Sequence, residues 1–260
     1  MKIRGFIVTG VLFAAVGAGI TGYAASRDDF NYEEIQNVNV ELEEKSYSAA
    51  EVDRIYLSAS ADSFKIIETD TDEIKITGKK TNYMSYTYTL EEKELTIQQE
   101  YEEKWYFRIF PFNLYQLWAD TDTSYTIAIP KNAIAEMHLE IHAGNIMIEH
   151  QELTRMVLDV NAGNVEILDT TVKEADIQVN AGNIKLTALT AEELHLIVNA
   201  GNVNANGRII KSANFEVNAG NIDLELIGTE QDYCVNGKGN GAAVITGNAD
   251  VGHFGYKYIE

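Results

Sequence analysis

Apolar and polar positions alternate along the C-terminal half of the chain, in a pattern that repeats every nineteen residues. Each repeat has two arms in which every second residue is apolar, as in half-buried β-strands. The first arm is apolar at Leu139, Leu158, Ile177, Leu196 and Phe215, and again at Ile141, Val160, Val179, Val198 and Val217. The second arm is apolar at Ile146, Val165, Ile184, Val203 and Ile222, and again at Ile148, Ile167, Leu186, Ala205 and Leu224. Leu153, Val172 and Ile210 are further apolar positions in the rest of the unit.

The sequence Ala-Gly-Asn joins the two arms and occurs five times without insertion or deletion. The apolar sets on its two sides are an odd number of residues apart, so a straight strand would point them to opposite faces. The chain must therefore turn between them, and Gly and Asn are the residues that tolerate the backbone of such a corner. The predicted corner residues are Gly144, Gly163, Gly182, Gly201 and Gly220, with Asn145, Asn164, Asn183, Asn202 and Asn221. A degenerate sixth copy falls in register at 237–240.

A strict period of this size predicts an all-β fold, a parallel β-solenoid with 19-residue coils. We prefer it to a β-sandwich or a propeller-like array, because equal spacing without exception suits coils that stack at about 4.8 Å. The corner asparagines would then form a ladder of side-chain amides. A second column contains His142, Asn161, Asn180, Asn199 and Asn218. Both columns are predicted to fix the register, and the alternative is a polar stripe that binds a glycan.

The remaining sequence divides into a spacer and a β-rich domain. Residues 26–48 are acidic and without clear periodicity, which predicts a spacer. The β-solenoid domain is predicted over 49–260, with regular repeats at about 138–251. Residues 61–66 resemble a worn copy of the repeat corner. An insertion at about 78–123 interrupts the pattern.

The insertion contains the densest aromatic stretch of the chain, between residues 105 and 118. One interpretation is a cap that covers an end or a sheet of the solenoid. The other is a surface for a partner protein or for the membrane interface, where Trp and Tyr are favoured. The candidate surface residues are Trp105, Tyr106, Phe107, Phe110, Phe112, Tyr115 and Trp118.

The N-terminus predicts export. Lys2 and Arg4 precede an uncharged run from Gly5 to Ala25. A hydrophobic helix of this length just crosses a membrane core of about 30 Å, and the basic residues keep its short end in the cytoplasm. Residues 1–25 are therefore a transmembrane anchor, or a signal peptide cleaved near Gly22-Tyr23-Ala24. Either one places the rest of the protein outside the cytoplasm, tethered to the membrane or secreted.

Charge and chemistry narrow the function. A formal net charge of −20 excludes nucleic acid as a partner, because phosphates require a basic face. The charge serves solubility or attracts a cationic partner.

We find no nucleophile elbow, phosphate loop or metalloprotease helix, and expect no catalytic residue and no cofactor. His138 and His142 share one face of a strand, but no cysteine or carboxylate spacing completes a metal site. The single cysteine, Cys234, excludes an internal disulfide.

The serial Asn-Ala-Gly-Asn-Ile/Val corners, the strand that ends in Ile129-Pro130 and the hydrophobic N-terminus resemble the adhesin-like β-strand-repeat proteins of bacterial surfaces. The resemblance implies a β-solenoid, an exported location and no established enzymatic activity. It also implies a role as a surface interaction module or in the envelope-stress response. The expected partner is an unknown surface protein or glycan. The alternative is an enzyme that cleaves cell-surface polysaccharide, with Glu166, Lys185 and Asp223 on an outward face.

Overall fold

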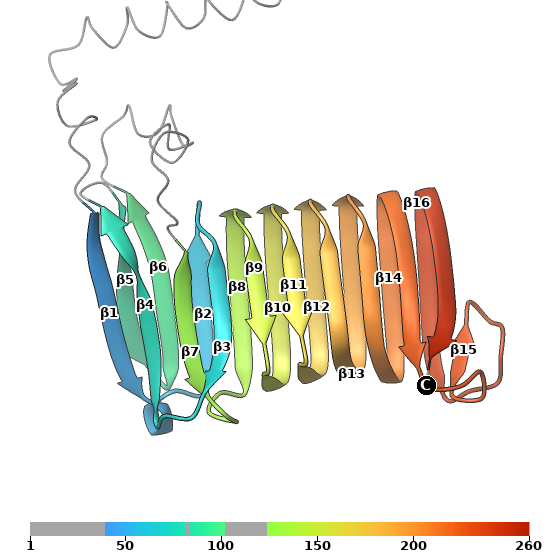
Figure 1. Cartoon of the computed structure of the whole chain (residues 1–260), viewed down its shortest axis with the longest axis horizontal. Coiled ribbons are helices and arrows are strands. Elements are labelled where there is room, and N and C mark those ends of the chain that lie inside the picture. The colour runs from blue at the N-terminus through green and yellow to red at the C-terminus, as the bar shows by residue number, and fades with distance from the viewer. Residues whose placement is uncertain (1–39, 82–83, 102–123, 260) are drawn as a thin grey trace, which may run out of the picture.

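The computed structural model describes residues 40–81, 84–101 and 124–259. These residues form one sixteen-stranded sheet, in which most neighbouring strands are parallel and stack side by side (Figure 1). The predicted all-β fold, built mainly of parallel strands, is confirmed. The elements are β1 (Val40–Ser48), the 3-10 helix η1 (Ala49–Glu51), β2 (Arg54–Ala59), β3 (Phe64–Thr69), β4 (Glu73–Thr81), β5 (Met84–Glu91), β6 (Glu94–Tyr101), β7 (Tyr125–Pro130), β8 (Glu136–Ala143), β9 (Ile146–Glu149), β10 (Glu152–Ala162), β11 (Val165–Leu168), β12 (Thr171–Ala181), β13 (Ile184–Ala200), β14 (Val203–Ile227), β15 (Tyr233–Val235) and β16 (Ala243–Ile259).

Equivalent residues of successive repeats lie opposite one another in parallel strands. In the first arm of each repeat, called the long arm from here on (the second is the short arm), Leu158 of β10 lies between Leu139 of β8 and Ile177 of β12. In the short arm, Val165 of β11 lies between Ile146 of β9 and its counterpart in β13. Each step in space is therefore nineteen residues along the chain, and each repeat makes one coil. The inward apolar side chains of both arms are buried in a single hydrophobic cluster.

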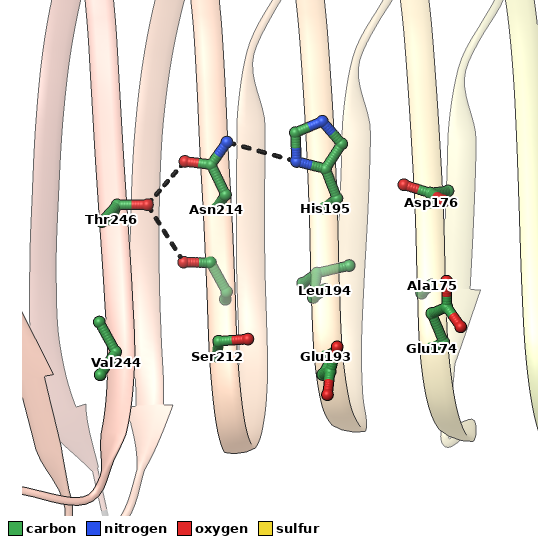
Figure 2. A pocket seen from close by; sticks show the side chains of 11 residues that line it. Glu174, Ala175, Asp176, Glu193, Leu194, His195, Ser212, Asn214, Val244 and Thr246 are labelled. Atoms are coloured by element: carbon green, nitrogen blue, oxygen red, sulfur yellow. Dashed lines mark hydrogen bonds between the residues drawn. The ribbon is translucent and has the colours of Figure 1, made fainter.

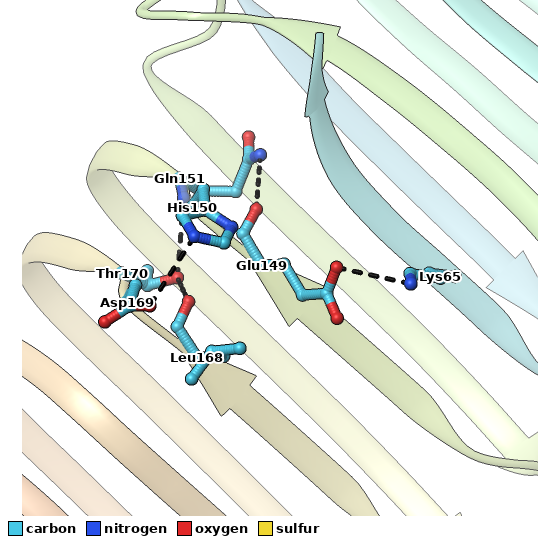
Figure 3. Close-up of polar contacts among 7 residues, drawn as sticks. All are labelled: Lys65, Glu149, His150, Gln151, Leu168, Asp169 and Thr170. Carbon is cyan, nitrogen blue, oxygen red and sulfur yellow. Dashed lines mark hydrogen bonds and ion pairs between the residues drawn. The ribbon is translucent and has the colours of Figure 1, made fainter.

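Each regular coil has a second corner, which the sequence pattern does not mark with a glycine. His150, Asp169 and Ala188 occupy equivalent positions, with φ angles of 57°, 45° and 52°. The next residue of each coil points inward, and in two coils it is polar, Gln151 and Thr170. Figure 3 shows how the fold accommodates them: Gln151 Nε2 donates to the Glu149 carbonyl at 2.9 Å, and Thr170 Oγ1 donates to the Leu168 carbonyl at 3.0 Å. These bonds satisfy polar groups that would otherwise be buried without partners.

The order of strands in space departs from the order in the chain at the N-terminal end. Strand β2 lies between β6 and β8, and β3 lies between β7 and β9. The worn corner predicted at 61–66 stacks directly on the first regular corner, since Asp62 N–H donates to the Ala143 carbonyl and Phe64 N–H to the Asn145 carbonyl. Beyond this coil the sheet continues in antiparallel pairings of β4 with β7, β1 with β4 and β5 with β6.

The structure adds detail to two predicted segments in this region. The last part of the predicted spacer, Val40–Ser48, forms β1, whose position is fixed by pairing with β4 and by a bond from the Tyr88 hydroxyl to Glu43 at 3.0 Å. The described parts of the predicted insertion belong to the sheet as the end of β4, β5 and β6. Polar, weakly alternating strands are stabilised here by tertiary pairing rather than by their own pattern.

The last coil also differs from the prediction. The degenerate copy at 237–240 does not form the sixth corner. Instead, Gly252 of β16 lies opposite Gly220 of β14, a step of thirty-two residues (252 minus 220), and the extra chain includes β15. Ile210 was expected inside but is exposed, because a register shift between Leu186 and Leu189 places Ile209 opposite the buried Ala191 in its stead, and a second shift before Glu193 restores the register.

Replacing Gly182 with Ala is expected to lower the free energy of unfolding by about 3 kcal/mol, a typical cost for backbone forced into strain. Its φ is +152°, and an added Cβ would lie 1.7 Å from the carbonyl oxygen of Gly163. Urea denaturation measures the loss. Gly237→Ala is the matched control, since Gly237 has a φ of +72° but no atom lies within 4 Å of its Cβ position. Equal losses in the two variants would contradict the importance of close stacking.

Candidate functional site

The corner asparagines form a continuous ladder of hydrogen bonds. The Oδ1 atom of Asn183 accepts a bond from the Asn202 backbone N–H at 3.0 Å and another from Asn202 Nδ2 at 3.2 Å. Equivalent pairs of bonds join Asn145 to Asn164, Asn164 to Asn183, and Asn202 to Asn221. The corner glycines beside them leave no room for a side chain, because each Cβ position is occupied by the preceding corner's carbonyl oxygen. The geometry gives these residues a structural role.

A second amide column lies on the outward face of the long arms. Asn180 donates to Asn161 at 2.6 Å, Asn199 to Asn180 at 2.6 Å, and Asn218 to Asn199 at 2.7 Å. Residue His142, at the head of the column, instead places Nδ1 3.4 Å from the Ala59 carbonyl. Because each primary amide has two N–H groups and two lone pairs, this column keeps hydrogen-bonding capacity for a ligand.

Beside this column the outward face is hollowed. The hollow has a volume of about 390 Å³. Its polar lining comes from neighbouring coils, so that Asp176, His195, Asn214 and Thr246 lie in one row across four strands (Figure 2). Asn214 Nδ2 lies 3.3 Å from His195 Nδ1, and the Thr246 hydroxyl donates to Asn214 Oδ1 at 2.6 Å. The second row of the lining is Glu174, Glu193, Ser212 and Val244.

Charges divide the hollow into two ends. Three carboxylates, those of Glu174, Asp176 and Glu193, line one end, while an amide and hydroxyls line the other. Arg155 reaches the acidic end from β10, with nitrogens 2.6 Å from Glu174 and 3.5 Å from Asp176. Lys211 lies 3.7 Å from Glu193. The carboxylates outnumber these cations, so the hollow suits ligand groups that donate hydrogen bonds, such as hydroxyls or ammonium groups.

The lysine beside the hollow is itself held in place. Lys211 Nζ lies 2.7 Å from Glu192, on the strand next to its own. The hydrogen bond from Lys211 lowers the pKa of the Glu192 carboxyl, and the same bond raises the pKa of Lys211. Both side chains are in contact with solvent, Lys211 more so than Glu192, so the pair contributes little to stability. It does keep a positive charge at the rim of the acidic end.

Sequence reasoning missed the hollow, although a signal for it was present. Asp176, His195 and Asn214 are nineteen residues apart and hold one outward position in successive coils. Tracing each outward position through the repeats would have shown a column whose chemistry changes at each step. The inward positions attract attention first because only they carry the apolar period.

The residues of the enzyme alternative do not assemble a catalytic pair. Lys185 Nζ lies 2.6 Å from Glu166 Oε1 on the adjacent coil, so the two charges neutralise each other. Asp223 lies opposite Gly255 of β16.

The candidate aromatic surface residues between 105 and 118 and the predicted anchor or signal at 1–25 lie outside the described residues. Within the described ranges no helix is long and apolar enough to cross a membrane.

Parallel coils that stack at a constant step, with corner glycines and external amide ladders, define a repeat protein of the stacked β-coil class. The family model described as Toastrack DUF4097 matches residues 52–240, and the chain belongs to this family. The match covers most of the coils and the N-terminal strands from β2 onward.

Several solved structures match most of the chain at low sequence identity and with TM-scores below 0.5. A putative adhesin from Bacteroides fragilis has a TM-score of 0.49 and 15% identity, over 84% of this chain and 97% of that one. A putative cell adhesion protein from Clostridium sporogenes has a TM-score of 0.33 and 13% identity, over 85% and 100%. A putative lipid binding protein from Parabacteroides distasonis has a TM-score of 0.33 and 14% identity, over 84% and 97%. Among the curated proteins, none matches the chain.

Replacing Asn183 with Ala is expected to lower the free energy of unfolding more than replacing Asn180. The corner residue loses an acceptor for a backbone N–H of the next coil as well as its side-chain bonds, at about 1 kcal/mol per hydrogen bond. Asn180 makes side-chain bonds only. Thermal and urea unfolding of the two single variants test the difference. If Asn180→Ala were the more damaging change, the corner ladder would not be the stabilising column.

Proposed function

We propose that the protein is a non-enzymatic β-solenoid that acts outside the cytoplasm as an adhesin-like surface interaction module. The hollow on the outward face of the long arms carries this proposal. It places carboxylates, amides and hydroxyls in a row while the inward and corner positions maintain the stack. Such a rigid face binds a partner without first having to order itself, which favours affinity.

The chemistry of the hollow indicates the partner. A ligand with many hydroxyl groups, as in a cell-surface glycan, would pair with Asn214, Thr246 and the second amide column. A basic segment of a surface protein would pair with the acidic end. The net charge of −20 favours either over an anionic ligand. Family resemblance adds a role in the envelope-stress response as a setting for such binding.

The N-terminal segment supplies the location in this proposal. Residues 1–25 would tether the coils to the membrane or direct their secretion. Residues 26–39 would then separate the first strand, β1, from the membrane surface, a shorter spacer than the sequence pattern predicts. The aromatic segment at 105–118 follows β6 and precedes β7, and it would add a second contact with the partner or the membrane interface.

Asn214→Ala combined with Thr246→Val is expected to reduce retention of the protein on purified cell-wall polysaccharide by about tenfold, equivalent to roughly 1.4 kcal/mol. The change removes the hydrogen-bonding row of the hollow. Asn204→Ala is the matched control, because Asn204 is an exposed asparagine of the short arm in β14. Equal retention of both variants would remove the hollow from the proposal. Release of new reducing ends by the unaltered protein would favour the polysaccharide-cleaving enzyme instead.

Replacing Trp105 and Trp118 with Ala is expected to leave unfolding unchanged and to weaken association with cell envelopes. This result follows if the aromatic segment is a contact surface. A loss of stability without loss of association in the intact fraction would identify it as a cap. Co-sedimentation with envelopes and thermal unfolding of the same preparation separate the two results.

A further inference from the structure

His138, Glu140 and Asp159 form a compact group of ligand atoms on β8 and β10, next to the strands that line the hollow. His138 and Glu140 are two residues apart in β8, so they share a face, and Asp159 of β10 lies directly opposite Glu140. His138 Nε2 lies 3.4 Å from Glu140 Oε1 and 3.9 Å from Asp159 Oδ2. One ligand atom from each residue lies within 4.8 Å of the other two. The structure therefore brings two carboxylates to His138, which the sequence spacing did not predict.

The three side chains of this group leave one hydrogen-bonding atom without a partner and two negative charges unbalanced. His138 Nε2 is buried and has no hydrogen-bond partner within the described ranges. Glu140 and Asp159 are like charges placed directly opposite on adjacent strands, an arrangement that destabilises a sheet. Neither carboxylate pairs with a lysine or arginine in the described part of the chain. A positive ion between the three side chains would resolve both problems.

The type and spacing of the ligands select the ion. Imidazole nitrogen with carboxylate oxygen is a donor set for Zn²⁺ and similar transition metals, whereas Ca²⁺ and Mg²⁺ take oxygen alone. Metal–ligand bonds of about 2.0–2.2 Å hold neighbouring ligand atoms roughly 3.3 Å apart. The 3.4 Å separation of His138 Nε2 and Glu140 Oε1 already meets this value. Asp159, about half exposed, needs only a small side-chain movement.

A third strand orients the group. The Tyr56 hydroxyl of β2 donates to Glu140 Oε2 at 2.8 Å, which leaves Oε1 facing His138. The Tyr56 ring meets the His138 imidazole edge-on, with the centroids 5.0 Å apart. Partners that orient ligands in this way are typical of metal sites. Tyr56 is therefore a positioning residue rather than a ligand.

We propose that His138, Glu140 and Asp159 bind one divalent transition-metal ion, with the remaining coordination positions open to solvent. The competing explanation is direct contact of His138 with the two carboxylates without a metal. Zinc binding by the unaltered chain distinguishes the two. The site is independent of the hollow and of the proposed adhesive function.

The test measures zinc binding by the full-length chain, prepared without a histidine tag and with Cys234→Ser to remove the only thiol. Competition against a chromogenic chelator is expected to show one Zn²⁺ per chain. Asp159→Asn and His138→Gln should each weaken binding at least about tenfold, and Tyr56→Phe by about tenfold, the usual effect of losing an orienting partner. The matched control is His150→Gln, since His150 lies 3.5 Å from Asp169 and belongs to no group of three ligands in the described part of the chain.

Thermal unfolding shows whether each variant is folded and whether zinc stabilises it. Zn²⁺ should raise the Tm of the parent chain and of His150→Gln, but not that of Asp159→Asn, whose metal-free Tm should be at least the parent's because the like-charge pair with Glu140 is gone. The proposal is overturned if Asp159→Asn binds zinc as well as the parent, if no zinc binds, or if Ca²⁺ displaces zinc at equal concentration. Co²⁺ bound to the same site should show visible d–d bands that disappear in His138→Gln, and bands that persist would equally overturn it.

Discussion

The whole structure depends on the close approach of successive corners. The carbonyl oxygen of each corner glycine lies where the next corner would carry a Cβ atom, for example Gly163 against Gly182. Only glycine permits this stacking, and the distance leaves no freedom for one coil to slip against another. The same alignment brings Asn164 and Asn183 into hydrogen-bonding contact and superimposes the inward apolar positions. Core, ladders and outward columns therefore share one register, and that register is set at the corner.

Local chemistry made the regular part of the fold predictable. The odd spacing between apolar sets requires a turn, and glycine and asparagine mark its place, so the corners and both buried arms could be read from the residues alone. The N-terminal end could not, because the placement of β2 between β6 and β8 depends on which strand edges are open in the folded protein. The exposure of Ile210 and the thirty-two-residue step to Gly252 likewise follow from local register shifts and an inserted loop, which leave no periodic signal.

Both candidate sites lie at outward positions of the coils. Inward positions of the two arms are apolar and the corner glycines admit no side chain, so most of the chemical variety lies at the outward positions. There, residues nineteen apart in the sequence lie opposite each other on neighbouring strands. Asp176 lies opposite His195, and Glu140 lies opposite Asp159. Motifs defined over a few residues miss such groups. The nineteen-residue period would have predicted the pairs of opposed outward residues from the sequence. The hydrogen bond from Tyr56 to Glu140 could not be predicted, because it depends on the non-sequential placement of β2 beside β8.

The same placement of β2 and β3 separates the chain into segments that acquire their neighbours at different times during synthesis. A coil such as β10–β11 meets both neighbours within about one period on either side, so the regular stack can grow by local contacts, which favours rapid folding. The coil of β2 and β3 is made before the regular repeats but must wait for β6 and β7 on one side and for β8 and β9 on the other. Its second edge stays open until about 80 further residues have been made, from the end of β3 at Thr69 to the end of β9 at Glu149. An early part of the chain is thus completed only when the first regular repeat has been made, whereas each later coil adds to a stack that is already present.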